Sequence, residues 1–246
     1  MAMTDKIAPN KRTSRGFSLV EVLVALAIFG VVMGSIYSLY IAQSQSAMTQ
    51  EEVVTLQKNL RAALFFMEQD LRMAGYNPER VNGDEAGEDI DCDGTDDAAQ
   101  NDNTATAMTD ESAKIRFKEA QTGSLTFTLD LDGDGDTCDA EETVSYTLND
   151  PNPDRLLRRN GSPIAENIEA IYFEYLTAGG TAAATIGDIR QVVVTAVART
   201  TNPDPKYTDG NSYQSLLGTT VFTVPTDAEH FRRQLLSTRV ECRNLD

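Results

Sequence analysis

The feature that most constrains the fold is an unbroken apolar run over residues 17–42, FSLVEVLVALAIFGVVMGSIYSLYIA. As an α-helix with a rise of about 1.5 Å per residue, this run would be about 39 Å long. The hydrocarbon layer of a bilayer is about 30 Å thick, so the helix is long enough to cross it with some tilt. The sequence therefore predicts a transmembrane segment over residues 17–42.

The charges on the two sides of this run predict its orientation. The preceding segment carries Lys6, Lys11, Arg12 and Arg15, whereas the whole chain has a formal net charge of −17. Basic residues beside a membrane helix favour the cytoplasmic side. We therefore expect residues 1–16 in the cytoplasm and the chain after residue 42 outside it.

Glu21 is the single ionisable acid in the apolar run. An acid inside a membrane segment costs about 3 kcal/mol and usually marks a functional group or a partner. A secretory signal peptide, with SQSA at residues 44–47 as a weak cleavage site, or a plain signal anchor would account for the apolar run. Neither alternative explains Glu21.

Residues 16–21, Gly-Phe-Ser-Leu-Val-Glu, follow a short basic leader and open the apolar helix. This arrangement resembles the cleavage and methylation motif of type IV prepilins. The resemblance implies that prepilin peptidase cuts between Gly16 and Phe17 and methylates the nitrogen of Phe17. It also implies that Glu21 pairs with the amino-terminal nitrogen of a neighbouring pilin, where the ion pair would set the axial register.

Residues 43–76 continue the helical pattern with a single apolar stripe, and Gly75 and Pro78 mark its end. The favoured interpretation is one continuous helix, with its first half in the membrane or the filament core and its second half on a globular head. A separate soluble helix after a hinge near residue 43 is the alternative. The stripe recurs every three or four residues, at Val53, Leu56, Leu60, Leu64, Met67, Leu71 and Ala74.

Residues 77–246 are expected to form an extracytoplasmic α+β head. Segments that alternate apolar and polar residues predict antiparallel strands, although residues 227–236 could also be helical. The expected fold is type IV pilin-like: a long N-terminal helix packed on an antiparallel β-sheet head, with acidic loops at residues 84–103 and 130–142. The strand segments are residues 114–120, 124–131, 142–149, 169–176, 189–200 and 234–242.

The loop DLDGDGDTCDAE, residues 130–141, matches the twelve-residue calcium-loop template. Hard oxygen ligands at alternate positions can surround one cation, and Gly135 at position six permits the sharp turn. A plain solvated acidic turn is the alternative. The predicted Ca²⁺ ligands are Asp130, Asp132, Asp134, Asp136 through its backbone carbonyl, and Glu141 at position twelve.

A second loop, DIDCDGTDDAAQ from residue 89, matches the same template incompletely. Asp89, Asp91 and Asp93 occupy the first ligand positions, but Gln100 stands where the bidentate Glu belongs. Weak extracellular calcium modules fill at millimolar calcium. We therefore expect a weaker Ca²⁺ site in this loop.

Each acidic loop also holds one cysteine. Cys92 lies in the loop that begins at residue 89 and Cys138 in the loop of residues 130–141, so a disulfide could join the loops in an oxidising compartment. Cys242 competes for either partner, so the spacing leaves the pairing open. The cysteines have no CxxC spacing, so zinc is not expected.

Two further segments resemble PilW-type minor pilins: MEQDLRMAGYNP at residues 67–78 and STRVECRNL at residues 237–245. The J-type minor pseudopilin of type II secretion is the nearest alternative. The implied function is a minor pilin that joins other major and minor pilins through its N-terminal helix, at or near the pilus tip. It would be a single-pass inner-membrane protein with a periplasmic head before assembly, and part of the surface pilus afterwards.

Other functions fit the sequence less well. A membrane-anchored calcium-binding adhesin outside any filament remains an alternative. A nucleic-acid partner is not expected, because phosphate binding needs a basic face. An enzyme is not expected either, because the chain has one histidine, His230, and lacks a phosphate cradle or a nucleophile elbow.

Overall fold

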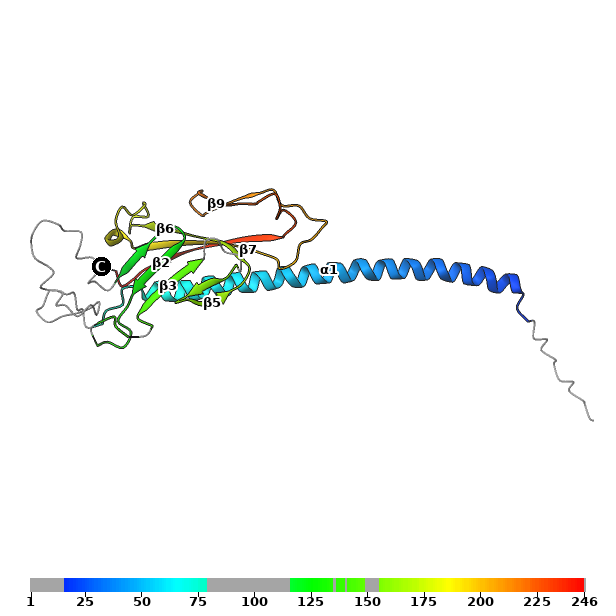
Figure 1. Ribbon diagram of the computed structural model, residues 1–246, viewed down its shortest axis with the longest axis horizontal. Coiled ribbons are helices and arrows are strands. Elements are labelled where there is room, and N and C mark those ends of the chain that lie inside the picture. Colours follow the sequence, from blue (N-terminus) through cyan, green and yellow to red (C-terminus); the bar gives the residue numbers. More distant parts are fainter. Residues whose placement is uncertain (1–15, 79–115, 135, 140, 149–154, 246) are drawn as a thin grey trace, which may run out of the picture. The chain divides into compact units, whose positions relative to one another are not determined.

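The computed structural model describes residues 16–78, 116–134, 136–139, 141–148 and 155–245. The chain forms two compact units, residues 1–49 and residues 50–246. One helix, α1 (Leu19–Met73), contributes its first part to the first unit and its second part to the second unit, which we call the head (Figure 1).

The first part of α1 is long and apolar enough to cross a membrane, and its apolar window is not buried in the protein. Large apolar side chains from Leu19 to Ile41 are exposed to solvent. A contiguous apolar surface of this extent is unfavourable in water and marks an interaction surface. This N-terminal apolar helix is therefore consistent with a membrane anchor.

The second part of α1 buries the apolar stripe in the core of the head. The spacing of three or four residues places these side chains on one face of the helix, which packs with side chains from the sheets. Val53 is half-buried at the start of the stripe. The buried members are Leu56, Leu60, Leu64, Met67, Leu71 and Ala74, together with Ala63.

A five-stranded antiparallel sheet has the order β1-β2-β3-β4-β5. Its last two strands form a hairpin whose turn residues, Asn160 and Gly161, both have positive φ, at 48° and 76°. An Asn-Gly pair is favoured in such two-residue turns. The strands are β1 (Phe117–Ala120), β2 (Ser124–Thr128), β3 (Thr143–Leu148), β4 (Leu157–Arg159) and β5 (Ser162–Ala165).

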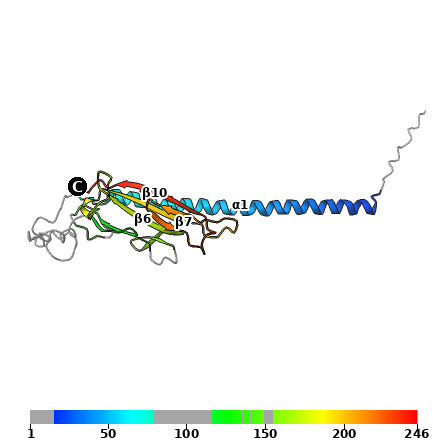
Figure 2. The same cartoon turned by 90° about the horizontal axis from the view of Figure 1, so that it is seen from above.

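A second antiparallel sheet has the order β10-β7-β6, and Figure 2 shows these strands side by side. Its central strand is almost wholly buried. Residues 200–232 leave this sheet between β7 and β10 and carry a two-stranded hairpin, β8–β9. The strands are β6 (Ile168–Leu176), β7 (Gln191–Arg199), β8 (Ser212–Gln214), β9 (Thr220–Thr223) and β10 (Arg233–Glu241), and one turn of 3-10 helix, η1 (Ile186–Asp188), precedes β7.

The fold is α+β and type IV pilin-like, as predicted: a long N-terminal apolar helix with antiparallel sheets. Each of the six predicted strand segments contains a strand. The structure adds the short hairpins β4–β5 and β8–β9, which the sequence did not predict. The segment 227–236 is not helical: residues 226–232 form turns and loop, and β10 begins at Arg233.

Candidate functional site

The loop of residues 130–142 leaves β2 and enters β3 beside the end of α1. The backbone N–H of Asp130 donates to the carbonyl of Tyr76 at 2.8 Å, and that of Leu129 donates to the carbonyl of Glu142 at 2.9 Å. One residue earlier along the helix end, Gly75 donates to the carbonyl of Thr128 at 3.0 Å. These bonds hold both ends of the loop against the carboxyl end of α1.

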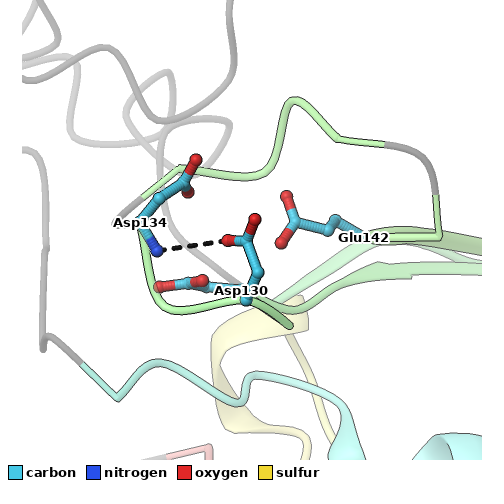
Figure 3. Close-up of side chains that lie close together, drawn as sticks. Asp130, Asp134 and Glu142 are labelled. Atoms are coloured by element: carbon cyan, nitrogen blue, oxygen red, sulfur yellow. Dashed lines mark hydrogen bonds between the residues drawn. The ribbon is translucent and has the colours of Figure 1, made fainter.

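Four carboxylates gather at this loop. One oxygen from each of Asp130, Asp132, Asp134 and Glu142 lies within 4.8 Å of the others, and Figure 3 shows three of these side chains close together. Two oxygens on opposite sides of one calcium ion, each at about 2.4 Å, would be about 4.8 Å apart. This cluster could therefore hold a metal ion with oxygen ligands.

Backbone N–H groups orient the carboxylates. Oδ1 of Asp130 accepts a hydrogen bond from the N–H of Gly133 at 2.6 Å, and Oδ1 of Asp132 accepts one from Asp134 at 3.2 Å. Oε1 of Glu142 accepts from the N–H of Leu131 at 2.7 Å. The carboxylates thus accept hydrogen bonds from backbone N–H groups of their own loop, in local turns of the kind that Asp favours.

Burial and charge make this cluster electrostatically costly without a counter-ion. Asp130 and Glu142 are buried, whereas Asp132 and Asp134 are exposed. The negative charge of Asp132, followed by burial and the charges of Asp134 and Asp136, raises the pKa of the nearby Asp139 carboxyl. A bound cation would offset this repulsion.

The two adjacent glutamates at the end of the loop have different partners. Glu141 has a φ of 80°, and its Oε2 accepts from Nη1 of Arg159 at 2.6 Å. Glu142 points into the cluster instead, with Oε2 accepting from the N–H of Asp139 at 3.2 Å. The structure thus brings Asp130, Asp132 and Asp134 together, but with Glu142 in place of Glu141.

The remaining predicted residues of the head are not in this cluster or are not described. Asp136 uses Oδ1 to accept from the N–H of Cys138 at 2.8 Å. Cys242 is a buried free thiol, and burial raises its pKa to about 12. The residues that lie outside the described part of the chain are Gly135, Asp89, Asp91, Asp93, Cys92 and Gln100.

The processing motif lies at the beginning of the described chain. Gly16 and Phe17 precede α1 and are exposed, and nothing lies within 4 Å of a Cβ built on Gly16. Glu21 lies in the first turn of α1, where a negative charge is favoured by the helix dipole, and is also exposed. All three are accessible to another molecule.

Two family models match the chain. One is described as a prokaryotic N-terminal methylation motif and matches residues 11–37. The other is described as prepilin peptidase-dependent protein B and matches residues 49–202, more than half of the chain. The chain belongs to the prepilin peptidase-dependent protein B family. The methylation motif and the greater part of the head of this family member are thus matched by two separate models.

Among solved structures, a type IV-like pilin from Thermus thermophilus is similar to this family member at 14% sequence identity. The match covers 52% of this chain and 81% of that chain, with a TM-score of 0.36. No curated protein matches the chain. The two family models show that the chain is a type IV pilin-like minor pilin or pseudopilin, from a structural family that is generally not enzymatic.

Proposed function

We propose that this protein is a minor pilin, a structural and assembly subunit of a type IV pilus that is incorporated at or near the tip. Residues 1–16 are the leader, residues 17–42 the transmembrane and filament-core helix, residues 43–76 the amphipathic half of that helix, and residues 77–246 the globular part of the head after the helix. Before assembly the chain crosses the inner membrane once, with its head in the periplasm. After assembly the head is at the cell surface.

The observation that carries this proposal is the junction at the start of α1. Gly16 and Phe17 are accessible, and the methylation-motif match spans them and the beginning of the apolar helix. Prepilin peptidase would cut between these two residues and methylate Phe17. The exposed apolar surface of α1 supports burial in lipid first and against other pilins later.

Glu21 is the proposed assembly residue. Its carboxylate would face the amino-terminal nitrogen that cleavage creates in a neighbouring subunit. A buried carboxylate alone is strongly penalised, whereas one that faces an ammonium group recovers part of that cost. Glu21→Ala should therefore leave processing intact and reduce incorporation into filaments, whereas a membrane-anchored adhesin outside any filament would be indifferent to this substitution.

Loss of the gene, scored separately for surface pili, twitching and secreted enzymes, tests the filament type. A minor pilin predicts fewer pili and lost twitching with normal secretion. A secretion defect with intact pili would instead identify a type II secretion pseudopilin. Complementation with the Gly16→Leu variant, which should not be processed, is the matched control for loss of the mature subunit.

We further propose that the loop of residues 130–142 binds Ca²⁺ through Asp130, Asp132, Asp134 and Glu142. Hard carboxylate oxygens at these separations suit Ca²⁺. Residues Asp89, Asp91 and Asp93 are proposed as a second, weaker site. Millimolar Ca²⁺ should raise the melting temperature of the mature protein, and EDTA should reverse the rise. An unchanged melting temperature with both additions would refute binding.

A disulfide between Cys92 and Cys138 is proposed to join the two acidic loops. The burial of Cys242 as a free thiol supports this pairing, because it removes the competing partner. Peptide mapping without reduction should recover the two loop peptides as one linked species. A linked peptide that contains Cys242 would contradict the pairing.

A further inference from the structure

β10 is a long edge strand with one open side. It pairs with β7 without a bulge over its whole length, from Arg233 to Glu241, and no strand of the described residues lies on its other side (Figure 2). Edge strands present unpaired N–H and C=O groups, which can pair with a further strand. β10 therefore offers a site at which this sheet can be extended.

The pairing with β7 determines which backbone groups face outward. The N–H of Cys242 donates to the carbonyl of Arg190, and that of Thr200 donates to the carbonyl of Arg232, both at 2.9 Å. Directly opposed residues of an antiparallel pair exchange hydrogen bonds at every second position, so the even-numbered residues of β10 bond to β7. The backbone groups that point away from β7, and that have no hydrogen-bond partner among the described residues, belong to Leu235, Ser237, Arg239 and Glu241.

The other edges of the two larger sheets are blocked. β6 has a bulge between Ile168 and Ala170, and on its outer side the N–H of Phe173 donates to the carbonyl of Thr122 at 2.9 Å. β5 is four residues long and contains Pro163, and β1 is four residues long and has a bulge. Short strands, bulges and proline keep edge strands from pairing with other chains. β10 is nine residues long and has neither a bulge nor a proline.

The open edge is basic, although the chain is acidic. Residues 232–243 contain four arginines and one acid, whereas the whole chain has a net charge of −17. Arg232 and Arg233 are paired with acids of the head. Arg239 and Arg243 are exposed, and neither forms an ion pair within the described residues. An acidic side chain on an added strand would therefore be favoured beside these two arginines.

We propose that β10 is a docking edge for one extended strand of a different pilin subunit, which places an acidic side chain beside Arg239. Main-chain hydrogen bonds along the edge provide the affinity, and the acidic side chain provides the selectivity. A second copy of this chain is a poor occupant, because two chains of charge −17 repel each other. One edge accepts one strand, so the contact ends after a single partner and fits a subunit at or near the tip.

This inference rests on the proposed function, and photo-crosslinking in the native cells tests it. The full-length chain carries p-benzoylphenylalanine in place of Leu235, and mass spectrometry of the crosslinked peptides identifies the partner and the segment that it contributes. The expected adduct joins β10 to an acidic strand segment of a different pilin.

Two pairs of variants test the hydrogen bonds and the charge. Glu241→Pro removes an outward N–H and should lower the adduct yield about tenfold, because proline cannot donate to an added strand. Glu241→Ala is its control, since it removes the same charge and keeps the N–H. Arg239→Glu should lower the yield about fivefold through like-charge repulsion. Lys206→Glu, the same charge change at an exposed residue away from β10, should leave the yield unchanged.

The contact would be overturned by an adduct to a second copy, by the absence of an adduct, or by equal yields from Glu241→Pro and Glu241→Ala. If Glu241→Pro does not fold, the comparison of Arg239→Glu with Lys206→Glu decides, and equal yields there would overturn the contact. The mass of the same chains reports cleavage after Gly16. Uncut chains would overturn the proposed function together with this contact, whereas cut chains without the adduct would overturn the contact alone.

Discussion

Arg159 of β4 donates from Nε to Oδ2 of Asp70 in α1 at 2.7 Å, and both side chains are mostly buried. The hydroxyl of Tyr146 donates to the same oxygen at 2.5 Å. Nη1 of Arg159 also donates a hydrogen bond to Oε2 of Glu141. One carboxylate on the helix thus anchors the five-stranded sheet and, through Arg159, the end of the acidic loop.

The first prediction concerns this anchor. Asp70→Asn removes the negative charge that pairs with the mostly buried guanidinium of Arg159. The free energy of unfolding should therefore fall by about 1–3 kcal/mol. Thermal melting of the mature protein measures this change. Glu68→Gln is the control on the same helix, because its pair with Arg72 is much more exposed. That control should change stability by less than about 1 kcal/mol, and equal effects of the two variants would contradict the anchor.

The second prediction separates the two adjacent glutamates. Glu142→Gln should abolish the rise in melting temperature that Ca²⁺ produces, because it removes a charged ligand from the cluster. Glu141→Gln should retain that rise, because the Glu141 carboxylate accepts a hydrogen bond from Arg159 and is not part of the cluster. Melting curves with Ca²⁺ and with EDTA distinguish them. If Glu141→Gln alone lost the calcium response, the ligand set would be the one expected from the sequence template.

The third prediction concerns the end of α1. Gly75 has a φ of +75°, and a Cβ at this position would overlap Cδ2 of Leu245 and lie 3.0 Å from the carbonyl oxygen of Asn244. Gly75→Ala should therefore lower the free energy of unfolding by about 2 kcal/mol or more. Gly123→Ala is the control, because nothing lies within 4 Å of its Cβ. Chemical denaturation should show a large loss for the first variant only.

The fourth prediction is a pH dependence. Hydrogen bonds from Arg232 and from the N–H of Lys206 hold the pKa of Asp204 below its ordinary value of 3.8. A depressed pKa contributes stability that is present above the unfolded value and is lost as pH falls through the folded value. The melting-temperature difference between the unchanged protein and Asp204→Asn should therefore be constant near neutrality and shrink below about pH 4. A difference that grew on acidification would contradict this sign.

Much of the fold could be predicted because periodicity is a local property. The stripe on α1 and the alternation in β6, β7 and β10 are visible in the sequence, whereas the hairpin β4–β5 was missed because its strands are very short. Its Asn160-Gly161 turn was the available signal. The β8–β9 hairpin has no such pair, and contacts with Glu174 and Arg233 from distant strands hold it.

The acidic loop shows where local patterns stop being sufficient. Alternate acids placed Asp130, Asp132 and Asp134 near one another, because the template spaces ligands around a turn. The template assumes a helix after position twelve, but here β3 begins at Thr143. The positive φ of Glu141 turns its side chain toward Arg159 and leaves Glu142 in the cluster. Arg159 comes from a later strand, so the loop sequence alone does not contain this information.

The most direct test of the central claim is the amino terminus of the protein purified from its native cells. Mass spectrometry of the intact chain and of its first peptide should find Phe17 as the first residue, carrying an N-methyl group. The Gly16→Leu variant should retain residues 1–16 and remain in the membrane. A mature chain that begins at Met1, or one cut after residue 47 at the end of the SQSA segment as a secretory signal peptide would be, would contradict the account.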